Sequence, residues 1–228
     1  MDFDFNPFFE KYEALARTAD QVFERVKQEY PALVKCRTGC ADCCHALFDL
    51  SLIEALYLNH FFVKTFEGQA RQQLLERANR ADRRVYKLKR QAYRDLRRGR
   101  PEVEILEDMA RERVRCALLN KKDRCDLYAH RPITCRFYGI PTSINGRGHT
   151  CGLSGFREGE SYPTVNLDAI QRKLYDLSAE LIRTLKSRHV KMAEMLVPVS
   201  MALLTEYDEN YLGMPDAKDP KTEGEEHD

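Results

Sequence analysis

The sequence predicts an all-α, mainly helical fold with one loop-rich segment that carries cysteines. Apolar residues recur at three- and four-residue steps through most of the chain, which places them on one face of a helix. No alternation of strands and helices is present, so a parallel α/β sheet is not expected. The chain has 228 residues, 43% of them hydrophobic, and can bury a core without covalent cross-links. We therefore expect a single helical domain over residues 1–207.

The first two helices carry start or stop signals. Apolar residues keep a helical period over residues 8–30, and Pro31 stops this helix. A second helix is expected over residues 51–65, since Ser51 and Glu54 form a capping-box signature ahead of an apolar face. The first cysteines lie in the link between these two helices.

A long third helix is expected from the apolar positions in residues 75–96. Gly99 and Pro101 interrupt it, and a shorter fourth helix should follow over residues 102–115. The period then disappears over residues 116–162, where glycines are frequent. Loops on a helical scaffold commonly carry the functional site, so this segment is a candidate.

The C-terminal part again has a helical period. Asn166 is expected to cap a helix whose apolar face is formed by Leu167, Ile170, Leu174, Leu177, Leu181 and Leu185. A last helical piece should run over residues 192–207 and bend near Pro198. Residues 208–228 are acidic and hold little that can be buried, so we expect a disordered tail there.

The eight cysteines form two groups along the chain. The first group is Cys36, Cys40, Cys43 and Cys44, which lie within nine residues. A soft metal centre needs several thiolates that converge at roughly 2.3 Å, and closely spaced cysteines on a turn provide this convergence. Cysteines that only fill a core are normally scattered singly. The spacing therefore predicts a metal or iron–sulfur site.

The second group lies in the loop-rich segment and consists of Cys116, Cys125, Cys135 and Cys151. Arg131 and Arg136 lie close to Cys135 in sequence and could neutralise part of the charge of a thiolate site, with surface ion pairs as the alternative. An isolated loop that contains the adjacent residues Cys43 and Cys44 can rarely aim four thiolates at one centre. We therefore expect the two groups to meet, with the intervening helices forming an antiparallel excursion.

Disulfides and unrelated buried thiols are the alternatives to metal binding. Disulfide frameworks belong to short exported chains that cannot build a core. Residues 1–9 carry acids where a signal peptide needs bases, and no apolar run approaches the roughly 18 residues of a membrane span. We therefore expect a cytoplasmic protein that does not insert into a membrane.

The two cysteine segments resemble the YkgJ-type cysteine-cluster family. The resemblance rests on residues 36–44 followed by Ser51 and Glu54, and on the motif Cys125-x-Leu-Tyr-x-x-Arg131-Pro132-x-x-Cys135-Arg136. It covers roughly residues 36–151, although three residues rather than two separate Cys36 from Cys40. That family is described as a zinc- or iron-chelating domain with a CxxCxxCC signature, so the resemblance implies a metal site.

The sequence leaves the metal open. Eight thiolates would satisfy two zinc ions, two 4Fe–4S clusters, or one cluster with spare thiols. Adjacent side chains such as Cys43 and Cys44 tend to point apart, so both can serve only in a tight turn, on different metals of a cluster, or in separate sites. We favour a 4Fe–4S cluster over zinc, in a structural or redox role. A flagellin lysine methylase is similar in its cysteine cluster, so a cluster-dependent enzyme for methyl or electron transfer is the alternative.

Other polar residues near the cysteines are weaker candidates. His45, His130 and His149 could each replace one thiolate, but with eight thiols available we expect supporting roles. Asp42 and Asp123 are expected to stabilise turns. No catalytic residue can be identified.

The charge of the whole chain favours neither nucleic acid nor membrane as a partner, because 37 Lys and Arg oppose 36 Asp and Glu. Residues 71–100 are an exception, with twelve Lys or Arg against three Asp or Glu, a local charge of +9. A phosphate-binding stripe would fit this helix. Without a recognised motif or an aromatic-rich surface, we expect a solvated helix face and no nucleic-acid partner. A protein partner is left open.

Overall fold

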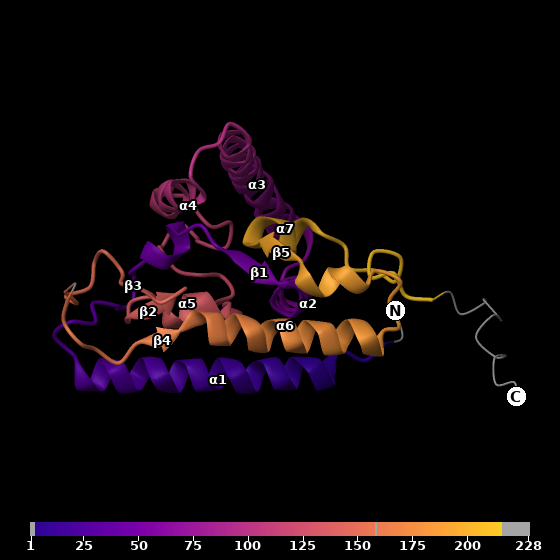
Figure 1. The fold of residues 1–228 in the computed structure, drawn as a ribbon. Helices are drawn as coiled ribbons and strands as arrows, with labels where there is room; N and C mark the ends of the chain where they lie inside the picture. The colour runs from indigo at the N-terminus through magenta and orange to yellow at the C-terminus, as the bar shows by residue number, and fades with distance from the viewer. Residues whose placement is uncertain (1–2, 158, 216–228) are drawn as a thin grey trace, which may run out of the picture.

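The computed structural model describes residues 3–157 and 159–215, and it confirms the mainly helical fold (Figure 1). The α-helices are α1 (Asn6–Glu29), α2 (Leu52–Thr65), α3 (Gly68–Arg97), α4 (Glu102–Arg111), α5 (Ile133–Phe137), α6 (Leu167–Thr184) and α7 (Val199–Leu204). The described residues also form the 3₁₀ turns η1 (Asp42–His45), η2 (Tyr128–His130) and η3 (Val190–Glu194). No helix of the described residues combines the length and the apolar composition needed to cross a bilayer.

The strands in the described part of the chain are short and form two small sheets. They are β1 (Asp49–Ser51), β2 (Thr142–Ile144), β3 (Arg147–His149), β4 (Val165–Asn166) and β5 (Leu196–Pro198). β1 pairs antiparallel with β5, while β2 pairs antiparallel with β3 and parallel with β4. Asn145 (φ 50°) and Gly146 (φ 74°) join β2 to β3, and two successive positive φ angles are typical of a type I′ hairpin turn.

Helix α2 lies at the centre of the molecule. Every residue from 51 to 58 is buried, so this helix has no solvent face over its first two turns. It contacts α1, α6 and α7. Figure 1 shows α1 and α6 side by side beneath α2, with α7, α3 and α4 on the opposite side. The expected capping box is present, since the Glu54 carboxylate accepts from the backbone and the hydroxyl of Ser51.

Helix α4 ends earlier than the sequence suggested. The expected helix extended to residue 115, but α4 stops at Arg111 and the chain then becomes extended. The backbone N–H of Val114 donates to the His45 carbonyl at 3.0 Å, and that of Cys116 donates to the Cys44 carbonyl at 2.7 Å. Backbone hydrogen bonds to residues 44 and 45 thus form where the sequence suggested the last turn of α4.

The C-terminal part also differs from expectation. Instead of one bent helix over residues 192–207, the chain forms η3, β5 and α7, because residues 196–198 pair with β1. Leu212 is fully buried, and its carbonyl accepts from the Ser187 hydroxyl at 2.6 Å. The first part of the expected tail, residues 208–215, therefore packs on the domain. The rest of that tail, residues 216–228, lies outside the described residues.

Candidate metal centre

The structure brings the two cysteine segments together, as expected from the sequence. The backbone contacts of Val114 and Cys116 join the second segment to η1, which carries Cys43 and Cys44. Arg113 donates to Asp42 at the start of η1 and strengthens the same junction. Helices α2, α3 and α4 form the excursion that separates the two segments in sequence.

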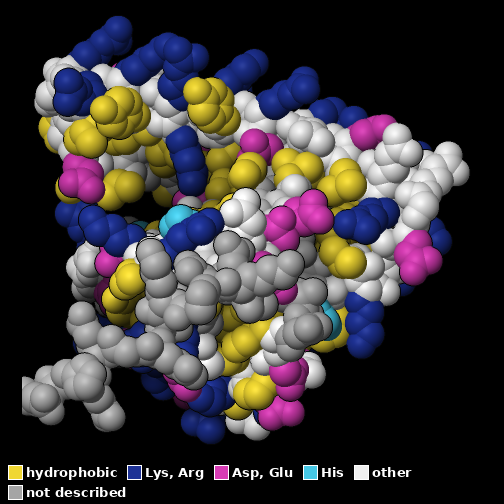
Figure 2. Space-filling view, turned by 90° about the vertical axis from the view of Figure 1, so that its right-hand side faces the viewer, with side chains coloured by type: hydrophobic (Ala, Val, Ile, Leu, Met, Phe, Trp, Pro, Cys, Tyr) yellow, Lys and Arg dark blue, Asp and Glu magenta, His cyan; other side chains and the backbone are white. Residues whose placement is uncertain are grey.

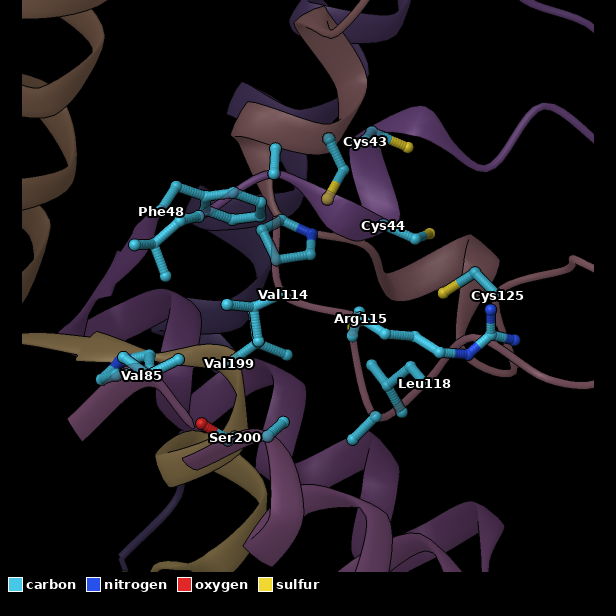
Figure 3. Close-up of a pocket in the computed structure, with 18 of the residues that line it drawn as sticks. Cys43, Cys44, Phe48, Val85, Val114, Arg115, Leu118, Cys125, Val199 and Ser200 are labelled. Carbon is cyan, nitrogen blue, oxygen red and sulfur yellow. The ribbon is translucent and has the colours of Figure 1, made fainter. Parts of the chain in front are cut away.

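Five cysteines line one cavity of about 60 Å³ between the two segments, and we call them the inner group (Figure 3). They are Cys43, Cys44, Cys116, Cys125 and Cys135. In Figure 3 the side chains of Cys43, Cys44 and Cys125 lie along one side of the pocket, and apolar side chains such as Phe48 and Val85 lie along the other. The tight turn η1 lets both adjacent cysteines reach this cavity despite the usual divergence of neighbouring side chains.

The other three cysteines, Cys36, Cys40 and Cys151, do not line this cavity, and we call them the outer group. The Cys36 thiol donates to the Tyr138 carbonyl at 3.5 Å, and the Cys151 thiol donates to Asp42 Oδ2 at 3.4 Å. Burial, then the charges of Cys40 and Cys151, raise the pKa of Cys36 to about 11. The outer group therefore lies near η1 but outside the cavity that the inner group lines.

All eight cysteines are free, half-buried thiols. Within residues 3–157 and 159–215, no three His, Cys, Asp or Glu side chains are gathered closely enough around one point to hold a single metal ion. What the inner thiols share is a cavity, and their donor chemistry is that of a soft-metal site.

The inner thiols differ in their readiness to ionise. A hydrogen bond with Cys44 lowers the pKa of Cys43 to about 7, and the positive charge of Arg131 acts in the same direction. The same hydrogen bond raises the pKa of Cys44. Burial raises the pKa of Cys116 to about 12, and burial together with neighbouring thiolates raises the pKa of Cys135 well above its usual value. The adjacent pair of Cys43 and Cys44 thus provides a thiolate near neutral pH more readily than Cys116 or Cys135 does.

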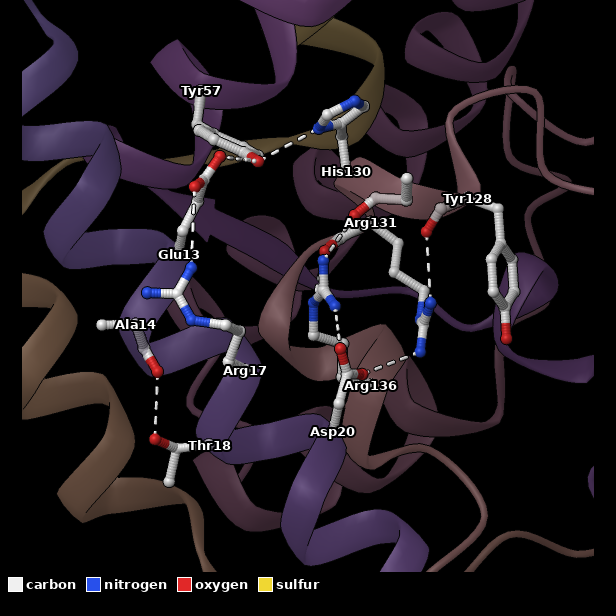
Figure 4. Close-up of polar contacts among 11 residues, drawn as sticks. Glu13, Ala14, Arg17, Thr18, Asp20, Tyr57, Tyr128, His130, Arg131 and Arg136 are labelled. Atoms are coloured by element: carbon white, nitrogen blue, oxygen red, sulfur yellow. Dashed lines mark hydrogen bonds and ion pairs between the residues drawn. The ribbon is translucent and has the colours of Figure 1, made fainter.

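The two arginines near Cys135 have different surroundings (Figure 4). Both donate to the carboxylate of Asp20 on α1. Arg136 is buried and also donates to the carbonyls of Arg131 and Ala129, so it holds the turn before α5 in place. Arg131 lines the cavity, as Arg115 does, and its positive charge helps to lower the pKa of Cys43. Arg131 is thus placed to neutralise part of the negative charge of thiolates in the cavity. Arg136 instead forms a buried ion pair with Asp20 that has a structural role.

Glu54 has a second contact that the sequence did not reveal. Its Oε2 caps α2 through Ser51, and its Oε1 accepts from the backbone N–H of Ile133 at 3.0 Å. Ile133 is the first residue of α5, the helix that carries Cys135. One buried carboxylate therefore anchors the starts of two helices, and burial raises its pKa. The capping-box spacing in the sequence predicts the contact of Glu54 with Ser51 but not its contact with Ile133.

The histidines and Asp42 do not line the cavity. His45 Nδ1 lies 3.0 Å from the Ala41 carbonyl, His130 stacks on Phe61 near the Tyr57 hydroxyl, and His149 is exposed on β3. Asp42 accepts from Arg113, Tyr138 and Cys151, so it holds the loops of the outer group together.

Comparison with known proteins gives one match. Residues 35–152, more than half of the chain, match the CxxCxxCC family, whose description is "putative zinc- or iron-chelating domain". The matched range contains all eight cysteines. No curated protein and no solved structure matches the chain significantly.

Proposed function

The chain belongs to the CxxCxxCC family of zinc- or iron-chelating domains, and from this premise we propose that its inner group binds an iron–sulfur cluster in a structural or redox role. The single observation that carries the proposal is the cavity lined by five cysteines from both segments. Thiolates are the ligands of 4Fe–4S clusters, which need four of them. Four inner cysteines would satisfy one cluster and leave one thiol over.

The size of the cavity favours a cluster over a single zinc ion. Its volume is about 60 Å³, whereas one water needs about 10–15 Å³ on the same measure. A single ion needs no more room than one water, so zinc would leave much of this space open. A cluster brings its own bridging sulfides and fills a larger volume.

The residues around the inner group suit an anionic centre. Arg131 supplies a positive charge at the cavity wall, and the apolar side chains of Phe48, Val114 and Val199 limit the access of water. Both features influence the reduction potential of a thiolate-bound centre. Eight free thiols also fit a reducing compartment, which supports a cytoplasmic location as part of this proposal.

Metal analysis of protein purified without oxygen tests the proposal. A brown protein with iron, acid-labile sulfide and visible absorption is expected, and a colourless protein loaded with zinc would reject the cluster. Cys125→Ser should lose the metal, while the matched control Cys151→Ser in the outer group should keep it. If Cys151→Ser loses the metal and Cys125→Ser keeps it, the assignment to the inner group is wrong.

A second candidate, a cluster-dependent enzyme, is supported by the wall of the cavity that carries no thiols. Phe48, Val85 and Val199 form an apolar surface opposite the cysteines, with Ser200 beside them. An enzyme needs room next to its metal for a substrate, whereas a purely structural site is closed. Perturbation of the visible spectrum of the loaded protein by small methyl donors would favour this candidate, and an unchanged spectrum would reject it.

A further inference from the structure

The cations of α3 are unevenly paired. Arg77, Arg84 and Lys89 form ion pairs with Asp126, Glu112 and Asp49, and Arg100, beyond the end of the helix, pairs with three acids. Seven other cations are exposed and make no ion pair with any residue that the structure describes. They are Arg80, Arg83, Lys87, Arg90, Arg94, Arg97 and Arg98.

Six of these cations form two rows along the helix. Residues seven apart complete nearly two turns of an α-helix, so they lie above one another at a spacing of about 10 Å. One row is Arg80, Lys87 and Arg94, and the next is Arg83, Arg90 and Arg97. Figure 2 shows Lys and Arg side chains along the upper edge of the molecule, over α3, with hydrophobic side chains between them.

A third row, of tyrosines, flanks the row of Arg83, Arg90 and Arg97. Tyr86 and Tyr93 are also seven residues apart, and each is 62% exposed. Helical geometry places this row about 50° from the arginine row on the same solvent-facing side. An aromatic surface was not expected on this helix from the sequence, and the two exposed rings supply one.

We propose that the solvent-facing side of α3, over residues 80–97, binds single-stranded nucleic acid. Phosphates contact the two rows of cations, and bases stack on Tyr86 and Tyr93. Binding sites for single strands combine a positively charged track with aromatic rings, and base stacking is tolerant of sequence. This proposal is independent of the metal centre and opposes the expectation of a merely solvated face.

An anionic membrane surface fits this side of α3 less well. A helix that lies in a bilayer interface inserts an apolar face. On the apolar face of α3, Leu74, Ala78 and Val85 are buried, and Leu96, which is 49% exposed, lies on that face and not among the rows of cations. The solvent-facing side of α3 would therefore present only cations and two phenolic rings to a bilayer. On a single strand, by contrast, the cations can contact phosphates and the tyrosine rings can stack on bases.

Fluorescence anisotropy with a labelled single strand of about 16 nucleotides tests the proposal on the full chain. Affinity should fall between about 50 and 200 mM salt, with a log–log slope that includes about −0.7 for each phosphate contact. Arg90→Gln with Arg94→Gln should weaken binding and reduce this slope by about 1.4. The matched control Arg172→Gln with Lys173→Gln, exposed on α6, removes the same charge and should bind like the unchanged protein.

The tyrosines are tested separately. Tyr86→Ala and Tyr93→Ala should each weaken binding of the oligonucleotide by about fivefold or more, with the salt slope unchanged. The same variants should bind inorganic polyphosphate like the unchanged protein, because that polymer has no bases. Circular dichroism and metal content should match the unchanged protein in every variant.

Four results would overturn the inference. The first is a lack of oligonucleotide binding at low salt, which would mean that this side of α3 is only a solvated helix face. The second is equal behaviour of the α3 and α6 charge variants. The third is full affinity of both tyrosine variants for the oligonucleotide, which leaves a general polyanion site. The fourth is binding to vesicles of phosphatidylserine and phosphatidylcholine without binding to the oligonucleotide.

Discussion

At the scale of single residues, two adjacent thiols share a hydrogen bond that makes them unequal. This contact lowers the pKa of Cys43 to about 7, whereas burial raises the pKa of Cys116 to about 12. The inner group therefore holds one thiol that ionises near neutral pH among others that keep their protons. A metal must displace those protons when it binds.

We expect the affinity for zinc, used as a probe, to rise steeply with pH on both sides of neutrality. Each bound thiol whose pKa lies above the solution pH releases a proton, so log K rises by about one per pH unit for every proton released. A competition titration with a chromophoric chelator at several pH values measures this slope. An affinity that is independent of pH would contradict binding through the inner thiols.

Glu54 is the second residue with a large expected effect. Replacing it with Ala leaves the buried N–H groups of Ser51 and Ile133 without their acceptor, and the free energy of unfolding should fall by about 2–4 kcal/mol. Urea unfolding measures the change. Glu10→Ala, on the exposed side of α1, should change stability by less than about 0.5 kcal/mol. Equal midpoints for the two variants would show that the Glu54 contacts contribute little.

At the scale of secondary structure elements, α5 depends on its neighbours. It has five residues, too few for a helix that is stable alone. Glu54 on α2 anchors its first residue, and Asp20 on α1 holds Arg136 within it. Cys135 therefore occupies its place because two longer helices fix the short one that carries it.

Asp20→Asn tests this arrangement. The buried Arg136 would lose its carboxylate partner, which costs about 1–2 kcal/mol after allowance for the partial exposure of Asp20. The thermal midpoint and the metal content should both fall. Glu24→Gln, which removes a solvent-exposed ion pair with Lys27 on the same helix, should leave both unchanged. A stable Asp20→Asn protein with a full complement of metal would show that α5 does not need this anchor.

At the scale of the whole molecule, a metal in the inner group would link two segments separated by α2, α3 and α4. Binding to such a site is coupled to folding because its ligands do not meet in the unfolded chain. The helices α1, α2 and α6 pack on one another through the apolar core and not through cysteines. Their stability should depend less on the metal than that of η1 and α5.

Hydrogen exchange with and without a chelator tests this difference. Removing the metal should speed exchange in η1, in residues 113–137 and in the contact between Cys116 and Cys44, and slow-exchanging amides of α2 should change least. Cys135→Ser should reproduce the pattern and lower the thermal midpoint. Unchanged metal content and thermal stability in Cys135→Ser would mean that the two segments do not share a site.

The sequence by itself determined the helical class, the capped start of α2, the cap of α6 at Asn166 and the two cysteine groups with their family. Each of these depends on residue type and on contacts between near neighbours, which periodicity and spacing reveal. Only the tertiary structure decided the pairing of β1 with β5, the early end of α4 and the division of the thiols into inner and outer groups. It also decided the second contact of Glu54. These features join residues far apart in the chain, and local patterns do not specify which distant segment supplies a partner for an unpaired backbone or side-chain group.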